Sequence, residues 1–210
     1  MNATSPIQLT DLHLDALAEL VNLGVSNAAT NLSEMVHEEI VLSVPRVSMV
    51  TRQEAIEILQ GRDAKQLIAI HQEFEGDIRG RALLIFPEAK SLELIRALVG
   101  ADLSLEDIME LEQEALAETG NVLLNACLST MANSLQRNLR ISLPEIIRGD
   151  GEEFFHLTAS PAAGDTVLFI YINFSVKHRD IQGYLALLLD IPSLAILQTL
   201  LVEYIERTAG

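Results

Sequence analysis

The chain has 210 residues and is 49% hydrophobic but only 4% aromatic, which is enough apolar material for one packed domain, or two small ones, with a mainly aliphatic core. Its net charge of −16 argues against nucleic acid and anionic membrane as partners, because both attract basic surfaces. Such an acidic chain suits either a partner protein with a basic surface or solubility alone.

Cysteine content, metal-ligand spacing and targeting segments indicate where the protein would be found and which sites it lacks. The single cysteine, Cys127, rules out an intrachain disulfide, and the apolar sequence around it predicts a buried, unreactive thiol. No Cys/His cluster has the spacing of metal ligands, so no metal site is expected. The first residues lack the basic and apolar segments of a signal peptide, and the longest apolar stretch, "YLALLLDIP", is too short to span a bilayer. We expect a soluble, cytoplasmic protein.

Elements in the first half follow from apolar periodicity and from capping residues. Apolar residues recur at steps of three and four, the spacing of one helix face, at Leu17, Leu20, Gly24, Ala28 and Leu32. The alternating stretch that follows predicts a half-buried strand, and Pro45 within it fits an edge strand. In order, the expected elements are a helix from Thr10 or Asp11 to about 37, a strand over 40–50, a short helix over 53–59, a hairpin over 66–76 and 79–87, and a helix over 88–100 ended by Gly100.

The second half is expected to differ by one element. A second long helix begins after a cap at Ser104, and Pro192 lies in the favoured first turn of a closing helix. The stretch "EIIRGDGEEF" predicts a loop where the first half has its short helix. The expected elements are a helix over 105–138, strands at about 140–147, 154–160, 166–176 and 180–189, and the closing helix from Pro192.

The sequence repeats itself internally. Four residues recur 99 positions later, namely Asp15, Glu19, Asn22 and Pro45 at Glu114, Glu118, Asn121 and Pro144. Gly80 maps to Gly183 with an offset of 103, so a short length change lies between the two matches. A duplication predicts two repeats, over about 7–100 and 104–206, within one domain covering 1–210. We therefore expect an α/β (α+β) fold with pseudo-two-fold symmetry, a mainly antiparallel sheet and two long surface helices.

A polar strip stands out on the first long helix. At about 100° per residue, Asp15, Glu19 and Asn22 lie within roughly 60° of one another and opposite the apolar set, so the strip should face solvent or a partner. An ordinary solvated helix face is the plain alternative. Two observations weigh against it, since asparagine is a mediocre residue for mid-helix and the same residue types return at the same spacing in the second copy.

The strip is better equipped to complete another protein's active site than to catalyse a reaction alone. The sequence shows no Ser/His/Asp set and no nucleophilic cysteine beside it. A carboxamide can orient a water molecule through its oxygen and its NH₂ group, and an exposed carboxylate can pair with a lysine on a partner.

At these residues the sequence resembles the CheC/CheX/FliY family of chemotaxis phosphatases. The family pattern is Asp or Ser, three residues, Glu, two residues, Asn, twenty-two residues and Pro, and the first copy satisfies it with Asp15, Glu19, Asn22 and Pro45. The segment "NLGVSNAATNLS" and the strand "VPRV" also resemble the family.

The second copy matches the pattern at Glu118, Asn121 and Pro144 and departs from it at Glu114, which replaces Asp or Ser. The resemblance extends over nearly the whole chain, and two motif copies make it most like CheC.

The resemblance implies a phosphatase that hydrolyses the aspartyl phosphate of a CheY-like response regulator. In each site, Asn22 or Asn121 would place a water in line with the acyl phosphate, and Glu19 or Glu118 would pair with the regulator's lysine. The prolines would shape the adjacent strand, and the chain would need no cofactor because the regulator supplies Mg²⁺. Two alternatives stay open, a non-catalytic module that binds a regulator or the deamidase CheD, and a structural component of the flagellar switch.

Overall fold

The computed structural model describes most of the chain, over residues 7–36, 39–61, 66–99, 105–157, 163–176 and 179–209. The expected helix end at Gly100 and the expected cap at Ser104 lie outside these ranges. Among the described residues, no helix combines the length and the apolar character that crossing a membrane requires.

The first half forms the elements that its sequence predicts. They are α1 (Asp11–Val36), β1 (Ile40–Thr51), α2 (Arg52–Gln60), β2 (Leu67–Gly76), β3 (Gly80–Pro87) and α3 (Glu88–Val99). A capping box starts α2, because the Thr51 side chain accepts from the Glu54 N–H at 3.2 Å while the Glu54 carboxylate accepts from the Thr51 N–H at 2.7 Å. The apolar set predicted for the first helix is buried, with Leu17, Leu20 and Ala28 fully inaccessible to solvent.

The second half corrects two predictions. Its elements are α4 (Leu105–Ser134), β4 (Leu139–Ile141), β5 (Glu145–Gly149), α5 (Gly151–Leu157), β6 (Ala163–Val176), β7 (Arg179–Asp190) and α6 (Ile191–Ala209). The loop expected over 145–154 is wrong, because β5 and the short helix α5 occupy this stretch. The strand expected over 154–160 is wrong over 154–157, where α5 continues, and its last three residues lie outside the described ranges. The expected strand over 140–147 is two short strands, and the long helix ends four residues earlier than expected, at Ser134 rather than 138.

Helix α5 has a physical cause that the sequence displays. The Glu153 N–H donates to the Asp150 carboxylate at 2.9 Å, and the Asp150 N–H donates to the Glu153 carboxylate at 2.9 Å. This reciprocal pair satisfies two backbone donors at the helix start, as a capping box does. Phe154 and Phe155 are buried, so packing against the sheet stabilises the helix further.

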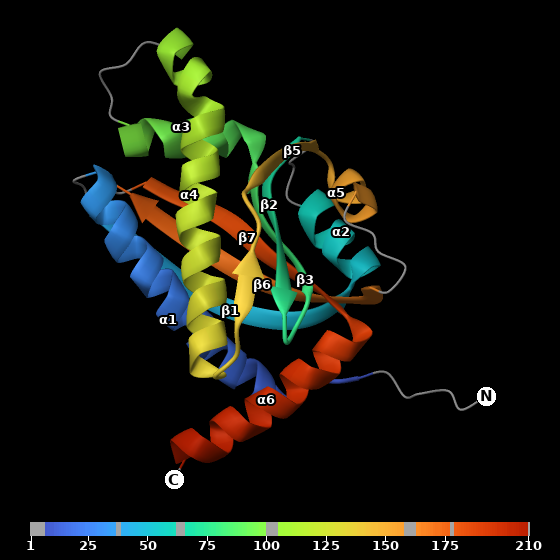
Figure 1. The fold of residues 1–210 in the computed structure, drawn as a ribbon. Coiled ribbons are helices and arrows are strands. Elements are labelled where there is room, and N and C mark those ends of the chain that lie inside the picture. The colour runs from blue at the N-terminus through green and yellow to red at the C-terminus, as the bar shows by residue number, and fades with distance from the viewer. Residues whose placement is uncertain are drawn as a thin grey trace.

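All strands join one antiparallel sheet. Its order is β1-β6-β7-β3-β2-β4, with β5 also paired to β2, and every pairing is antiparallel. The strand order is symmetric. Counted from either edge, it is the same once each strand is replaced by the strand at the matching position in the other half of the sequence. Figure 1 shows α1 and α4 in front of the sheet, with α2 and α5 beside each other at another part of it. The mixed α/β class and the dominant antiparallel pairing are confirmed, whereas the repeat boundaries stay a prediction.

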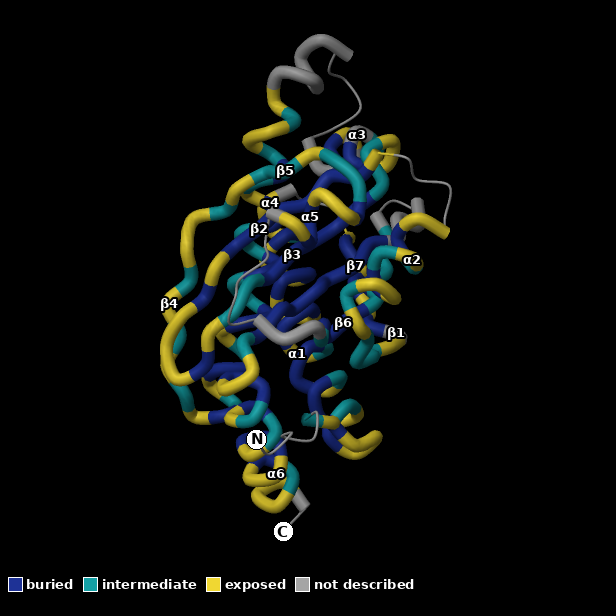
Figure 2. The backbone as a smooth tube through the Cα atoms, turned by 90° about the vertical axis from the view of Figure 1, so that its right-hand side faces the viewer, coloured by how far each residue is buried: buried dark blue, intermediate teal, exposed yellow. Residues whose placement is uncertain are grey.

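The sheet is buried on both faces. On β2, Ile68 and Ile70 belong to a large core with α1 and α4, whereas Leu67 and Ala69 belong to a smaller core with α2 and α5. This alternation follows from the two-residue period of a strand. Figure 2 shows the buried backbone concentrated in the central strands and exposed segments toward α6. A sheet covered on both faces gives the helices a rigid base.

The two long helices contact each other closely. A Cβ atom on Gly24 of α1 would lie 2.6 Å from the Cα of Cys127 on α4, so only glycine permits this approach. Cys127 is 1% exposed, and burial raises the pKa of its thiol to about 12. The predicted inert thiol is therefore confirmed. The close contact fixes the two helices, and with them the two polar strips, relative to each other.

Candidate functional site

In the first strip, the two carboxylates are exposed and the amide is partly buried. Asp15 and Glu19 of α1 are exposed, whereas Asn22 is half-buried. Glu19 lies close enough to Tyr204 of α6 to help raise the pKa of that phenol, although burial of the ring is the larger cause. The carboxylates therefore lie at the surface as predicted, and the amide reaches inward instead.

The Asn22 amide bonds to the backbone of the adjacent edge strand. The Val44 N–H donates to Asn22 Oδ1 at 3.0 Å, and Asn22 Nδ2 donates to the Val44 carbonyl at 3.4 Å. Val44 and Pro45 form a β-bulge, because Ser43 pairs with Asn173 and Arg46 with Tyr171, which leaves two residues opposite one. The amide thus stabilises the residue that precedes the proline, which explains the Asn-to-Pro spacing.

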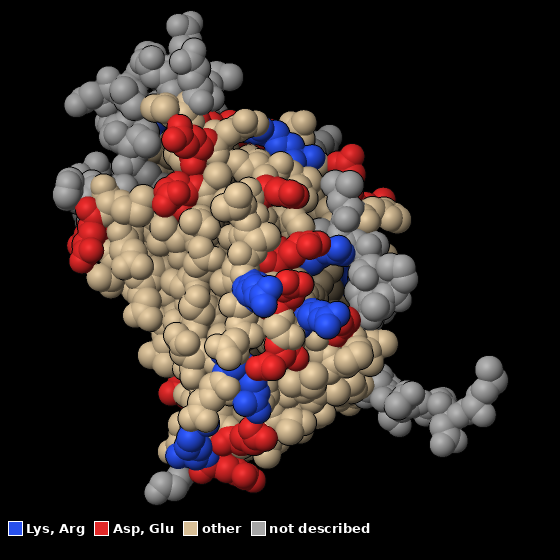
Figure 3. Space-filling model, in the orientation of Figure 1, with Lys and Arg blue, Asp and Glu red and all other residues tan. Residues whose placement is uncertain are grey.

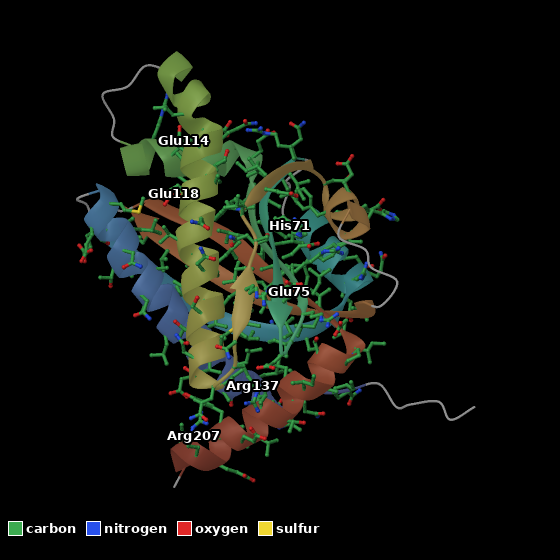
Figure 4. The ribbon with its side chains drawn as sticks, in the orientation of Figure 1. His71, Glu75, Glu114, Glu118, Arg137 and Arg207 are labelled. Carbon is green, nitrogen blue, oxygen red and sulfur yellow. The ribbon has the colours of Figure 1, made fainter. Side chains whose placement is uncertain are left out.

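The second strip has the same carboxylates but a different amide environment. Glu114 and Glu118, which Figure 4 labels on α4, are exposed. Asn121 is half-buried. Asn121 Oδ1 accepts two hydrogen bonds, one from Gln72 Nε2 at 3.2 Å and one from Asn125 Nδ2 at 2.8 Å. No bond to another described residue uses Asn121 Nδ2.

The edge strand beside the second strip is interrupted. Ile141 of β4 pairs with Phe74 and Glu145 of β5 with His71, so three residues, 142 to 144, lie opposite two, and one residue is again in excess. Leu143, which precedes Pro144 as Val44 precedes Pro45, is 83% exposed, whereas Val44 is 7% exposed. The first site is therefore closed around its amide, and the second is open at the same place.

In each strip, the two carboxylates and the amide lie together on one helix, as predicted. The structure adds residues around the amides that the sequence analysis missed. Val44 and Ser142 contribute backbone groups, and no sequence pattern marks them. Gln72 and Asn125 contribute side chains. Gln72 carried a readable signal, since it is a polar residue at an inward-facing position of the apolar strand "LIAIHQEF".

Both central carboxylates are available to a partner's cation. Neither Glu19 nor Glu118 forms an ion pair within the part of the chain that the structure describes, whereas Glu112 on the same helix as Glu118 pairs with Arg148 at 2.6 Å. Figure 3 shows a broad uncharged area in front of α1 and α4, interrupted and bordered by acidic side chains, with basic side chains only toward its right and lower edges. In the described ranges, no three His, Cys, Asp or Glu side chains gather in a way that would hold a metal ion.

Family comparisons agree with the resemblance carried by these residues. The model of the CheC-like family matches residues 12–49, and the model of the chemotaxis phosphatase CheX matches residues 68–168. The CheY-P phosphatase CheC of Bacillus subtilis is 29% identical over 136 residues, which is 63% of this chain and 65% of the relative, so the chain spans less than two thirds of that protein's length.

Solved structures show the same fold at low sequence identity. FliY of Thermotoga maritima superposes with a TM-score of 0.70 at 17% identity, over 94% of this chain and 100% of that one. The FliM middle domain of Vibro alginolyticus gives 0.60 at 13% identity, over 88% and 99%. The solved structures share the mixed α/β fold of this chain. The resemblance to the CheC/CheX/FliY family is confirmed by the matches to both family models and to CheC.

His71, beside the second site, should make stability depend on pH. Burial is the main cause that lowers its pKa, and the weaker attraction of Glu145, 3.6 Å away, opposes it. The folded chain therefore binds fewer protons than the unfolded chain, so stability present above the ordinary histidine pKa of about 6.5 is lost as the pH falls below it. Replacing His71 with phenylalanine, the residue that the other hairpin carries in the matching position, Phe169, should flatten this loss.

Urea unfolding between neutral and mildly acidic pH measures the effect. The exposed His156 provides the control, and His156→Gln should keep the wild-type slope of unfolding free energy against pH. If His71→Phe also kept that slope, the buried imidazole would not be its source.

Proposed function

We propose that this chain accelerates hydrolysis of the aspartyl phosphate of a CheY-class response regulator, with Glu19 and Asn22 in one site and Glu118 and Asn121 in the other. The observation that carries the proposal is an exposed carboxylate, unpaired with any described residue, one helical turn before a half-buried amide on each long helix. The family resemblance supports it, since the matched relative is named a CheY-P phosphatase.

In the proposed reaction, the chain positions a water molecule and the regulator provides the rest. The water oxygen attacks phosphorus in line with the aspartate oxygen, the bond from phosphorus to that oxygen breaks, and the regulator's aspartate and inorganic phosphate are released. The proton that the water loses passes to the phosphate or to solvent. Positioning alone can lower the barrier substantially, because an aligned nucleophile no longer has to be ordered in the transition state.

The carboxylates need a cation to be compatible with phosphate. An unpaired Glu19 or Glu118 beside a phosphoryl group would repel it, whereas pairing with a lysine of the regulator removes the repulsion and aligns the two proteins. The Mg²⁺ ion belongs to the regulator in this proposal. Asp15 and Glu114 support the strips, and Pro45 and Pro144 shape the strand that borders each amide. The chain would act where its regulator acts, in the cytoplasm.

A binding-only role is the second candidate, and one observation favours it for the first site. Asn22 already bonds through both ends of its amide to Val44, so it must leave the strand before it can hold a water through both groups. Such a site would retain a regulator without hydrolysing its phosphate. Binding of the deamidase CheD is a separate proposal that rests on the family resemblance alone.

Turnover at low dose separates the two candidates. A CheY-class regulator phosphorylated with a small-molecule phosphodonor is mixed with the chain at a molar ratio far below one, and loss of phosphate is timed. A phosphatase shortens the lifetime of the whole regulator pool. Binding alone alters only the fraction that the chain can occupy, and that result would contradict the proposal.

A further inference from the structure

Gln72 is a fully buried polar side chain within the large core. It is 0% exposed on β2 and lies on the strand face that otherwise carries Ile70 and Phe74. The other hairpin has an apolar residue there. On β2, Gln72 pairs with Ala82 of β3, and on β6, Ile170 pairs with Leu185 of β7. Ala82 and Leu185 are separated by the same 103-residue offset as Gly80 and Gly183, so Ile170 is the counterpart of Gln72. The chain therefore accommodates isoleucine at this layer in one half and retains glutamine in the other.

Retaining glutamine costs stability. Its Oε1 is buried without a hydrogen-bond partner, which leaves an acceptor desolvated. Only its Nε2 is used, as a donor to the Ser142 carbonyl at 2.8 Å and to Asn121 Oδ1 at 3.2 Å. A buried glutamine whose Oε1 has no hydrogen-bond partner destabilises the core. We therefore look for its role in the two hydrogen bonds that its Nε2 donates.

The orientation of Asn121 follows from these contacts by elimination. A backbone carbonyl can only accept, so the Ser142 carbonyl requires the NH₂ end of Gln72. That NH₂ has a second hydrogen, which requires an acceptor, so Asn121 must turn its oxygen toward Gln72. Asn125 donates to the same oxygen at 2.8 Å and reinforces the choice. The NH₂ of Asn121 then lies on the opposite branch of its amide, where no described residue accepts from it.

We propose that Gln72 is a positioning residue for Asn121, and that it makes the second site the principal one. This inference rests on the proposed function. Gln72 and Asn125 hold the Asn121 amide in one orientation with its NH₂ group presented to the reacting water. In the first site, Ile170 occupies the place of Gln72 and cannot donate, and Val44 of the edge strand binds the Asn22 amide instead.

The test compares the two sites within one chain. Asn22→Ala leaves the second site alone, and Asn121→Ala leaves the first. Gln72→Ile is introduced into each background, and dephosphorylation of a CheY-class regulator is measured over a range of regulator concentrations. With Asn121 present we expect kcat to fall by about tenfold with KM unchanged, because a buried residue affects placement of the water without touching the regulator. In the Asn121→Ala background the same change should leave kcat as it was.

Matched variants separate positioning from loss of packing. Ile170→Val alters the residue at the matching position of the other hairpin, within the same large core, and should leave the activity of the second site unchanged. Asn125→Ala, which removes the other donor to Asn121 Oδ1, should lower kcat in the same background as Gln72→Ile. If Gln72→Ile fails to fold, this variant still tests whether the fixed orientation of the Asn121 amide sets the rate. An equal fall in both backgrounds, or no fall in either, would overturn the role of Gln72.

A readout without the regulator makes the inference independent of the reaction. In ¹⁵N-labelled protein, the side-chain amide signals of Asn121 should be dispersed in the wild type and should move toward those of an exposed asparagine in Gln72→Ile. Signals that do not move show that Gln72 does not order the amide. If Asn22→Ala combined with Asn121→Ala keeps full activity, the proposed function fails, while the amide signals still decide whether Gln72 holds Asn121.

Discussion

Replacing both Asn22 and Asn121 with alanine is expected to reduce the acceleration of regulator dephosphorylation to the background rate. Each amide is the one group in its strip able to hold a water through both a donor and an acceptor. A positioning gain of ~100-fold corresponds to roughly 2.7 kcal/mol of barrier, and that is the loss expected when both amides are gone. The measurement is the regulator-phosphate lifetime with catalytic amounts of each variant.

The two single variants should separate activity from stability. Asn121→Ala should cost more activity, because no described residue uses its NH₂ group. Asn22→Ala should cost more stability, about 1–3 kcal/mol, because the backbone N–H and carbonyl of Val44 lose their partner beside a buried side chain. Urea unfolding of each single variant measures that second effect.

Asparagines of the same helices supply the control. Asn31 of α1 and Asn133 of α4 are exposed and lie outside the strips, so changing both to alanine should leave the rate and the unfolding midpoint unchanged. A folded Asn22→Ala, Asn121→Ala protein that still shortened the phosphate lifetime as the wild type does would show that neither amide places the water.

Replacing Gly24 with alanine is expected to destabilise the whole domain. The added Cβ would lie 2.6 Å from the Cα of Cys127 and 3.0 Å from the carbonyl oxygen of Ala126, and these are backbone atoms that cannot rotate away. Alanine gains up to about 1 kcal/mol of helix propensity over glycine, but forcing two packed helices apart costs typically 1–3 kcal/mol or more. The cost of the clash should exceed the gain in helix propensity, so the variant should be less stable. Both sites should lose activity together, because α1 and α4 carry them.

Gly151 is the matched control for this substitution. It lies in α5, and a Cβ there would meet its nearest neighbour, a side-chain atom of Leu59, at an ordinary 3.4 Å. Gly151→Ala should therefore keep or slightly raise the free energy of unfolding measured in urea. An unfolding midpoint for Gly24→Ala equal to that of the wild type would mean that the helices can separate freely at their contact.

The two sites have diverged in ways that a shared motif does not reveal. Both copies keep the carboxylates, the amide and the proline at the same spacing. The residue before the proline is buried as Val44 in one copy and exposed as Leu143 in the other. Because the amide lies beside that residue, the same four-residue pattern yields one amide bonded to the strand and one bonded to Gln72.

Short-range signals explain where prediction from sequence succeeded and failed. The long helices and the hairpins were predicted well because their apolar periodicity extends over many residues. Helix α5 was missed although Asp150 and Glu153 have the spacing of a capping box, because "GDG" also favours a loop. The carboxylates were placed correctly at the surface, and the inward turn of the amides was not foreseen.

By itself, the sequence determined the mixed α/β class, the two polar strips and the residues that compose them. These follow from local periodicity and spacing, which the linear chain contains, whereas the family came from the resemblance of the strip residues to a known motif. Only the tertiary structure decided which partner each amide has. Val44 and Gln72 lie 22 and 49 positions from the asparagines that they bind, and Ser142 lies 70 positions from Gln72, so these hydrogen bonds depend on how helix, bulge and strand meet in space.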